Sequence, residues 1–167
     1  MVQCFEPGSV VCNLSSCDKL DTIREVIAKA TVFGDPDERA RIERAVIARE
    51  HMQSTGIGGG VAVAHGEVLS APEVVIALGV SPGGIAFDSI DGQPVHLLFV
   101  FATPPNQRQE YLQALCAIVR LVKADFFRRL LTSSLSAPEM QRRLFKAFRD
   151  LSRKLTTRTQ PTAQVSA

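Results

Sequence analysis

One histidine, His65, ends a short apolar segment that follows a glycine-rich loop, residues 54–64 (STGIGGGVAVA). A neutral imidazole can attack a phosphoryl group without a strong base nearby. The transfer then depends on in-line positioning and on neutralising the charge of the phosphoryl oxygens. The loop offers two hydroxyls and flexible N–H groups for that purpose. The pattern favours a histidine that carries or binds a phosphoryl group; the alternative is a structural histidine at a strand end.

The glycines of residues 56–60 fit neither of two common nucleotide-binding motifs. A P-loop needs a lysine and a hydroxyl residue after its last glycine, and neither follows here. The dinucleotide motif GxGxxG fails at Val61, and the loop lies between a predicted helix and a strand rather than the reverse. Two interpretations stay open. The backbone approaches an anion closely, or the loop is a tight turn that needs positive φ angles.

Arg49 immediately precedes this loop. It lies seven residues after Ile42 and three after Val46, which places it on the inward stripe of a predicted helix. Its guanidinium could direct two N–H groups onto phosphate oxygens. Alternatively, it ties the loop to the helix through carbonyls or a carboxylate. A further histidine, His96, lies inside an apolar strand and is interpreted as a structural residue.

Composition indicates one globular domain. The chain has 167 residues, of which 46% are hydrophobic and 22% charged. No apolar run approaches the roughly 20 residues of a membrane helix, and residues 1–8 lack the features of a signal peptide. We therefore expect a cytoplasmic protein that does not insert into membranes.

Charge is distributed unevenly, with eleven basic and three acidic residues between positions 120 and 158. The basic residues are interpreted as solvated helix faces. Without interleaved aromatic residues they do not indicate nucleic-acid binding. The four cysteines and three histidines lack metal-ligand spacing. We therefore expect reduced thiols, no metal and no cofactor.

The apolar pattern predicts helices, then a sheet, then helices. Residues 1–16 are expected to form an N-terminal arm, residues 17–151 the domain, and residues 152–167 a disordered tail. Asp35, Pro36 and Glu38 have the pattern of a helix start with a capping box, and Gly34 ends the preceding helix. Helices are predicted over 18–33, 36–50, 107–123, 125–131 and 137–151, and strands over 61–64, 74–80 and 95–102. Within 107–123 the predicted buried stripe is Leu112, Leu115, Val119 and Val122. The predicted class is α/β, with a mixed central β-sheet sandwiched by helices.

In combination, these residues resemble the enzyme IIA domain of the bacterial phosphotransferase system. The resemblance is to the fructose/mannitol type, in particular its nitrogen-regulatory branch. It rests on Arg49-Glu50, on residues 54–58 (STGIG), on the strand ending in His65, on residues 87–95 (FDSIDGQPV) and on the apolar strand before Pro104. It covers roughly residues 10–150 and implies the mannitol-type IIA fold.

The resemblance also implies roles for individual residues. His65 would accept phosphate through Nε2 from the phosphohistidine of HPr. Arg49 would bind the phosphate oxygens, and Ser54, Thr55 and Gly56 would shape the phosphate pocket. The further partners would be regulatory target proteins or a IIB domain.

Two positions depart from the family pattern. Ala64 replaces the usual proline before the active histidine. Tyr111 stands where the family usually has a second histidine. A tyrosine can donate a hydrogen bond to phosphate or to His65, but it cannot become a cation. Tyr111 either contributes that bond or covers the pocket with its ring.

We therefore expect a regulatory histidine phosphocarrier. One alternative is a sugar-specific fructose/mannitol IIA component. Another is a binding module that is not phosphorylated.

Overall fold

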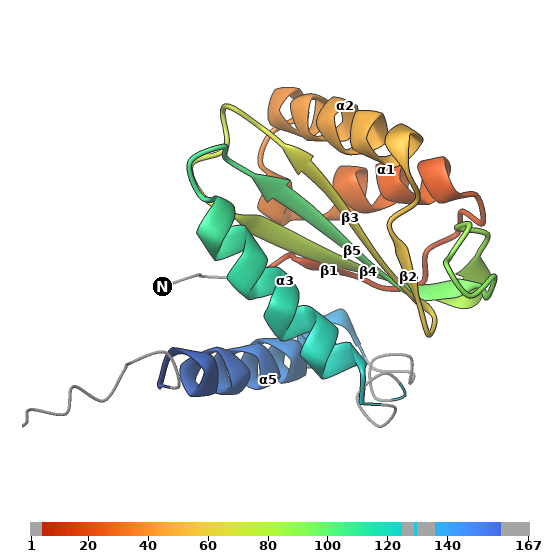
Figure 1. Ribbon diagram of the computed structural model, residues 1–167. Helices are drawn as coiled ribbons and strands as arrows, with labels where there is room; N and C mark the ends of the chain where they lie inside the picture. Colours follow the sequence, from red (N-terminus) through yellow and green to blue (C-terminus); the bar gives the residue numbers. More distant parts are fainter. Residues whose placement is uncertain (1–4, 125–128, 130–135, 158–167) are drawn as a thin grey trace, which may run out of the picture.

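A five-stranded mixed sheet lies between two layers of helices in the computed structural model (Figure 1). The structure describes residues 5–124, 129 and 136–157. The strand order is β1-β4-β5-β3-β2. The parallel pairs are β1 with β4 and β3 with β5; β4 pairs antiparallel with β5, and β2 with β3. The strands span Val10–Val11 (β1), Gly56–Gly58 (β2), Val61–Glu67 (β3), Val75–Ile85 (β4) and Val95–Thr103 (β5). The predicted fold class is confirmed.

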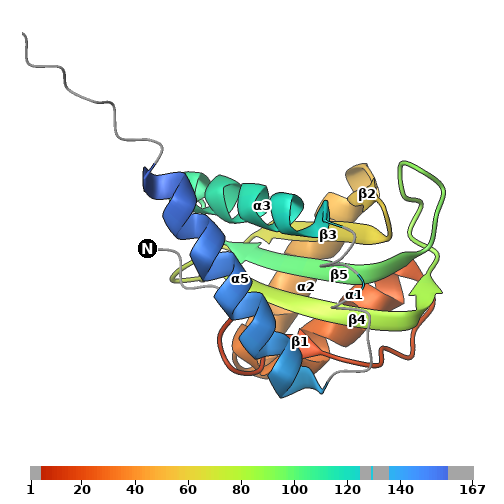
Figure 2. The same cartoon turned by 90° about the horizontal axis from the view of Figure 1, so that it is seen from below.

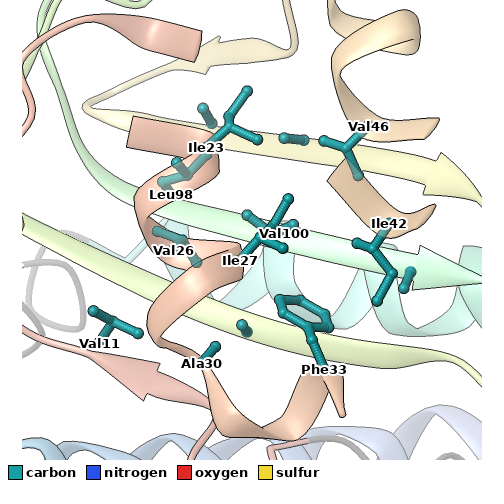
Figure 3. Packing of buried hydrophobic residues seen from close by; sticks show 14 of the residues in the cluster. Val11, Ile23, Val26, Ile27, Ala30, Phe33, Ile42, Val46, Leu98 and Val100 are labelled. Atoms are coloured by element: carbon teal, nitrogen blue, oxygen red, sulfur yellow. The ribbon is translucent and has the colours of Figure 1, made fainter. Parts of the chain in front are cut away.

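Helices α1 (Lys19–Lys29) and α2 (Pro36–Met52) cover one face of the sheet, joined by a 3-10 turn, η1 (Thr31–Phe33). Figure 3 shows residues of α1, η1 and α2 packed on Leu98 and Val100 of β5. The predicted helix over 18–33 is therefore too long. The chain leaves α-geometry at Ala30, whose backbone is extended.

The start of α2 follows the prediction in part. The side chain of Asp35 accepts a hydrogen bond from the N–H of Glu38 at 2.9 Å, and Pro36 is the first helical residue. The carboxylate of Glu38 accepts instead from the Ser70 hydroxyl and from Arg41. The reciprocal half of the predicted capping box is thus replaced by contacts with Ser70, in the loop after β3, and with Arg41 of α2 itself.

Helices α3 (Arg108–Val122) and α5 (Ala137–Thr157) cover the opposite face (Figure 2). The predicted stripe of α3 is wrong at Leu112, which is 48% exposed. The small side chains of Ala114 and Ala117 face the sheet instead, together with Ile118 and Val122. The predicted helix over 125–131 lies, apart from residue 129, outside the described residues.

Helix α5 continues to Thr157, so residues 152–157 are helical rather than the start of a disordered tail. The sequence of this stretch supports the extension, because leucines at 151 and 155 keep a four-residue spacing and basic residues favour a helix C-terminus. In the described part of the chain, none of the helices is long and apolar enough to cross a membrane.

Two short strands were absent from the sequence prediction. Val10–Val11 of the expected arm pairs with Leu78 and Gly79 of β4. Phe5 is buried, and its ring meets those of Phe99 and Phe148 edge-on. The described residues of the arm therefore contribute four apolar side chains to the core: Phe5, Val10, Val11 and Leu14. Within the glycine-rich loop, residues 56–58 form the edge strand β2 before the turn at Gly59 and Gly60.

Candidate functional site

Strand β3 brings His65 to the face of the sheet covered by α3. Side chains alternate along a strand. Val61 and Val63 accordingly join the cluster beneath α3 and α5, whereas Ala62 and Ala64 join the cluster beneath α1 and α2. His65 follows the first set, pairs with Phe101 of β5 and is half-buried. The strand therefore fixes the imidazole near its own C-terminal end.

A backbone carbonyl selects the tautomer of His65. Its Nδ1 lies 3.1 Å from the carbonyl oxygen of Val63. A carbonyl can only accept a hydrogen bond, so Nδ1 must carry the proton. In the neutral ring, Nε2 then keeps the lone pair and is the nucleophilic nitrogen.

The approach of α2 to β3 positions Arg49. Gly66 follows His65, and a Cβ atom there would lie 2.7 Å from the backbone of Ala45 and Val46. Only glycine allows α2 to lie this close to the strand. One turn further on, the half-buried Arg49 donates from Nη1 to the carbonyl of Gln53 at 3.0 Å. The guanidinium is thus held at the loop between α2 and β2.

Tyr111 reaches the same place from the first turn of α3. Its ring lies 5.6 Å from that of His65, with 37° between the planes. It also meets the ring of Phe101 at 5.5 Å and 89°. Burial raises the pKa of the Tyr111 phenol, and the positive charge of Arg49 opposes that rise. The phenol is therefore a neutral hydrogen-bond donor at pH 7.

The environment of His65 favours the neutral imidazole. Burial lowers its pKa below the ordinary value of 6.5, the hydrogen bond to Val63 opposes this, Arg49 lowers the pKa further and Glu50 raises it. The same positive charge acts on Tyr111. His65, Arg49 and Tyr111, three of the predicted site residues, thus form one electrostatic group.

The other three predicted residues shape the loop. The Ser54 hydroxyl donates to the carbonyl of Phe87 at 2.8 Å, and the Thr55 hydroxyl donates to Glu50. A Cβ atom at Gly56 would lie 2.5 Å from the hydroxyl oxygen of Ser89. Both hydroxyl protons are thus donated within the protein. One interpretation of the sequence had these hydroxyls available to bind an anion, and the structure does not present them in that way.

Glu50 was named from the sequence only within the motif Arg49-Glu50, with no role assigned to it, and Lys19 was missed. Lys19 lies 3.5 Å from the Glu50 carboxylate and 3.1 Å from that of Asp88. The signal for Glu50 was its spacing. It follows Ile42 and Val46 at intervals of four, so it lies on the buried stripe of α2, where Arg49 had been placed.

The remaining polar candidates lie outside this group. His96 directs Nδ1 to the carbonyl of Ser81 at 2.9 Å, which agrees with the predicted structural role. Among the described residues, no set of three or more His, Cys, Asp or Glu side chains could hold a metal ion. Cys17 and Cys116 are exposed free thiols.

Comparison with known proteins identifies the family of this chain. Residues 3–147 match the family "Phosphoenolpyruvate-dependent sugar phosphotransferase system, EIIA 2". The fructose-specific EIIABC component of Bacillus subtilis is 33% identical over 119 residues, covering 71% of this chain and 19% of that protein. The nitrogen regulatory protein of Bradyrhizobium diazoefficiens is 30% identical over 131 residues, covering 78% of this chain and 85% of that protein.

Solved structures show the same fold. Nitrogen regulatory protein IIA-Ntr from Neisseria meningitidis superposes with a TM-score of 0.73 at 26% identity, over 80% of this chain and 91% of that one. The mannitol enzyme IIA of Escherichia coli, solved in complex with phosphorylated enzyme IIB, gives a TM-score of 0.66 at 16% identity, over 87% of this chain and 96% of that one.

The layered mixed sheet is thus the fold of enzyme IIA proteins, including IIA-Ntr and the mannitol enzyme IIA. This chain belongs to the EIIA 2 family of the phosphoenolpyruvate-dependent sugar phosphotransferase system. It corresponds to about a fifth of the length of the Bacillus relative and to most of the Bradyrhizobium relative.

Proposed function

We propose that this chain is a histidine phosphocarrier. His65 takes a phosphoryl group from an HPr-type protein, and the phosphorylation state acts in regulation, as in a nitrogen-type IIA. The observation that carries the proposal is the hydrogen bond from Nδ1 of His65 to Val63. It leaves Nε2 as the nucleophile, beside the positive charge of Arg49 and the phenol of Tyr111.

The transfer step needs no external base. The Nε2 lone pair of His65 attacks the phosphorus of the donor's phosphohistidine, and an N–P bond forms. The donor's N–P bond breaks, and its electron pair returns to the donor imidazole. The proton on Nδ1 stays in place, held by the Val63 carbonyl. Arg49 and the Tyr111 phenol are the groups available to balance charge on the phosphoryl oxygens.

Exposed apolar side chains border these residues and suit contact with a protein donor. Met52 ends the helix that carries Arg49 and is 82% exposed. Leu112 follows Tyr111 and is 48% exposed. These two side chains offer apolar contact area to a protein donor, and methionine is enriched in protein interfaces.

The direct test is phosphorylation with phosphoenolpyruvate, enzyme I and HPr. We expect one acid-labile, base-stable phosphate per chain, and none in His65→Ala. A second IIA domain that is labelled in parallel controls for the donor proteins. If the control is labelled and this chain is not, the phosphocarrier proposal is wrong and a binding module that is not phosphorylated remains.

A sugar-specific role is the second candidate, because one relative is a fructose-specific component. The two roles differ in the next acceptor. A sugar-specific IIA passes its phosphate to a IIB domain, so phosphorylated chain mixed with a fructose- or mannitol-type IIB domain should lose its label. Retention of the label in that mixture favours regulation.

A further inference from the structure

Glu50 has a buried carboxylate that the proposed transfer step does not use. Its side chain is 0% exposed at the end of the buried stripe of α2, next to Arg49. A buried carboxylate is costly unless it is hydrogen-bonded and paired. Glu50 accepts from the backbone N–H of Thr55 at 3.1 Å and from its hydroxyl at 2.5 Å. Lys19 of α1 lies 3.5 Å away.

These bonds connect Glu50 to the imidazole through the backbone. The carbonyl of Thr55 accepts from the N–H of Val63 at 3.0 Å. The carbonyl of Val63 accepts in turn from Nδ1 of His65 at 3.1 Å. One loop residue and one strand residue thus lie between the carboxylate and the ring, so a displacement of Thr55 would move the acceptor that selects the tautomer.

The same loop holds the guanidinium. Arg49 donates to the carbonyl of Gln53, two residues before Thr55. Glu50 therefore secures, through Thr55, the segment to which Arg49 is anchored on one side and His65 on the other. In-line transfer requires the nucleophile and the charge-stabilising group to keep a fixed separation.

We propose that Glu50 is a positioning residue for phosphoryl transfer: by holding Thr55 it fixes the imidazole of His65 relative to the guanidinium of Arg49. This inference rests on the proposed phosphocarrier function, but its geometric part can be measured without any phosphate donor.

Charges around these groups make the effect observable by titration. Arg49 and Glu50 of α2 act on His65, and the phenol of Tyr111 on α3 lies against its ring. On the other side of Glu50, Lys19 also contacts Asp88. Because Glu50 raises the pKa of His65, its neutralisation should lower that pKa.

Two variants separate the charge of Glu50 from its hydrogen bonds to Thr55 in the loop. Glu50→Gln keeps the shape but replaces one accepting oxygen with a donating NH₂ group, which cannot accept from Thr55. Thr55→Val keeps the buried charge and the backbone bond and removes only the hydroxyl donor. The matched control is Glu43→Gln on the same helix, where the carboxylate is 41% exposed and pairs with Arg24.

The first readout is the imidazole nitrogen NMR spectrum of His65 over pH. The wild-type protein and Glu43→Gln should show the Nδ1-protonated tautomer. Glu50→Gln should show a mixture of tautomers and a lower pKa, and Thr55→Val a mixture without that drop in pKa. An unchanged tautomer in folded Glu50→Gln would overturn the inference, even if the pKa falls through the lost charge. If Glu50→Gln does not fold, an unchanged tautomer in Thr55→Val overturns it.

The second readout is the rate constant of phosphorylation by phospho-HPr. A misplaced reacting group costs roughly 10- to 100-fold in rate. We expect a loss in that range for Glu50→Gln, a smaller loss for Thr55→Val and none for Glu43→Gln. Equal rates in all folded variants would overturn the positioning role while leaving the phosphocarrier function intact. If the wild-type protein is not labelled, the proposed function fails, and the NMR titration still decides whether Glu50 positions His65.

Discussion

The imidazole of His65 and the phenol ring of Tyr111 lie side by side, with 5.6 Å between their centroids and 37° between their planes. They come from different layers, since His65 is on β3 and Tyr111 on the first turn of α3. An edge-on contact with Phe101 holds the phenol in place. Tyr111 therefore restricts the space around His65 and can reach a group bound to it.

Tyr111→Phe separates these two roles because it keeps the ring and removes the hydroxyl. If the phenol donates to a phosphoryl oxygen, the variant should shorten the lifetime of phosphorylated His65 by about 2- to 10-fold, the value of one hydrogen bond. The measurement is the decay of labelled protein at neutral pH. An unchanged lifetime would assign Tyr111 to packing alone. Tyr111→His, which restores a group that can become a cation, should lengthen the lifetime relative to Tyr111→Phe.

Arg49→Ala tests the neutralisation of phosphoryl charge. We expect phosphorylation of His65 to slow by about 100-fold or more, as when a preorganised donor is removed from a charged transition state. Arg49→Lys should recover only part of the rate, because an ammonium lacks the planar fork of the guanidinium. A quenched time course of labelling by phospho-HPr gives the rate constants.

Arg44→Ala is the matched control for this series, since Arg44 is exposed on the same helix. Thermal unfolding should be similar for the Arg49 variants and the control. Transfer at the wild-type rate in folded Arg49→Ala would reduce Arg49 to an anchor for Gln53.

Much of the sheet could be predicted because its central strands have a distinctive sequence. β5 and the first part of β4, residues 75–80, are nearly continuous apolar runs, as expected for strands covered on both faces. The extension of β4 to Ile85 was not predicted, because residues 81–84 (SPGG) have the composition of a turn. β1 could not be found in this way, since two valines are too few to show any periodicity. β2 consists largely of glycine, so its pairing depends on the register of β3 rather than on side chains.

Only part of the candidate site could be predicted from local sequence patterns. His65 could be identified from its place at the end of a short strand. Its neighbour must be glycine because the backbone of Ala45 leaves no room for a Cβ atom at Gly66. The rotation of α3 about its axis could not be predicted. Apolar residues at helical spacing begin at Leu112 and also at Tyr111, and the structure turns the second set toward the sheet. The bonds from Glu50 to Thr55 depend on how the loop folds back onto α2, which periodicity does not describe.

The pKa of His65 predicts an acid-dependent loss of stability. Burial lowers this pKa in the folded protein, the Val63 bond and Glu50 oppose the shift, and Arg49 strengthens it. In the unfolded chain the ring has its ordinary value of 6.5, so the unfolded chain binds the proton more readily. The free energy of unfolding should therefore fall as the pH drops through about 6.5.

The variant His65→Gln cannot ionise at this position, so its free energy of unfolding should fall less between pH 7.5 and pH 5.5. Urea unfolding of both proteins at the two pH values measures this difference. Equal pH dependence in both would contradict the lowered pKa. In the same pH range, the rate of phosphorylation should stay level from pH 8 to about 6.5 and decline only below, as protonation occupies Nε2.

Gly66→Ala tests the packing of α2 against β3. The added Cβ atom would lie 2.7 Å from backbone atoms of Ala45 and Val46, which cannot rotate away as a side chain could. Overpacking of this kind costs about 1–3 kcal/mol, so we expect the midpoint of urea unfolding to fall accordingly. Gly83→Ala is the matched control, since a Cβ atom there has no heavy atom within 4 Å.

Because α2 must move outward to accept the methyl group of Gly66→Ala, Arg49 should move with it and phosphorylation should slow even in the folded protein. A stable Gly66→Ala protein with wild-type kinetics would show that the close approach of α2 does not set the position of Arg49.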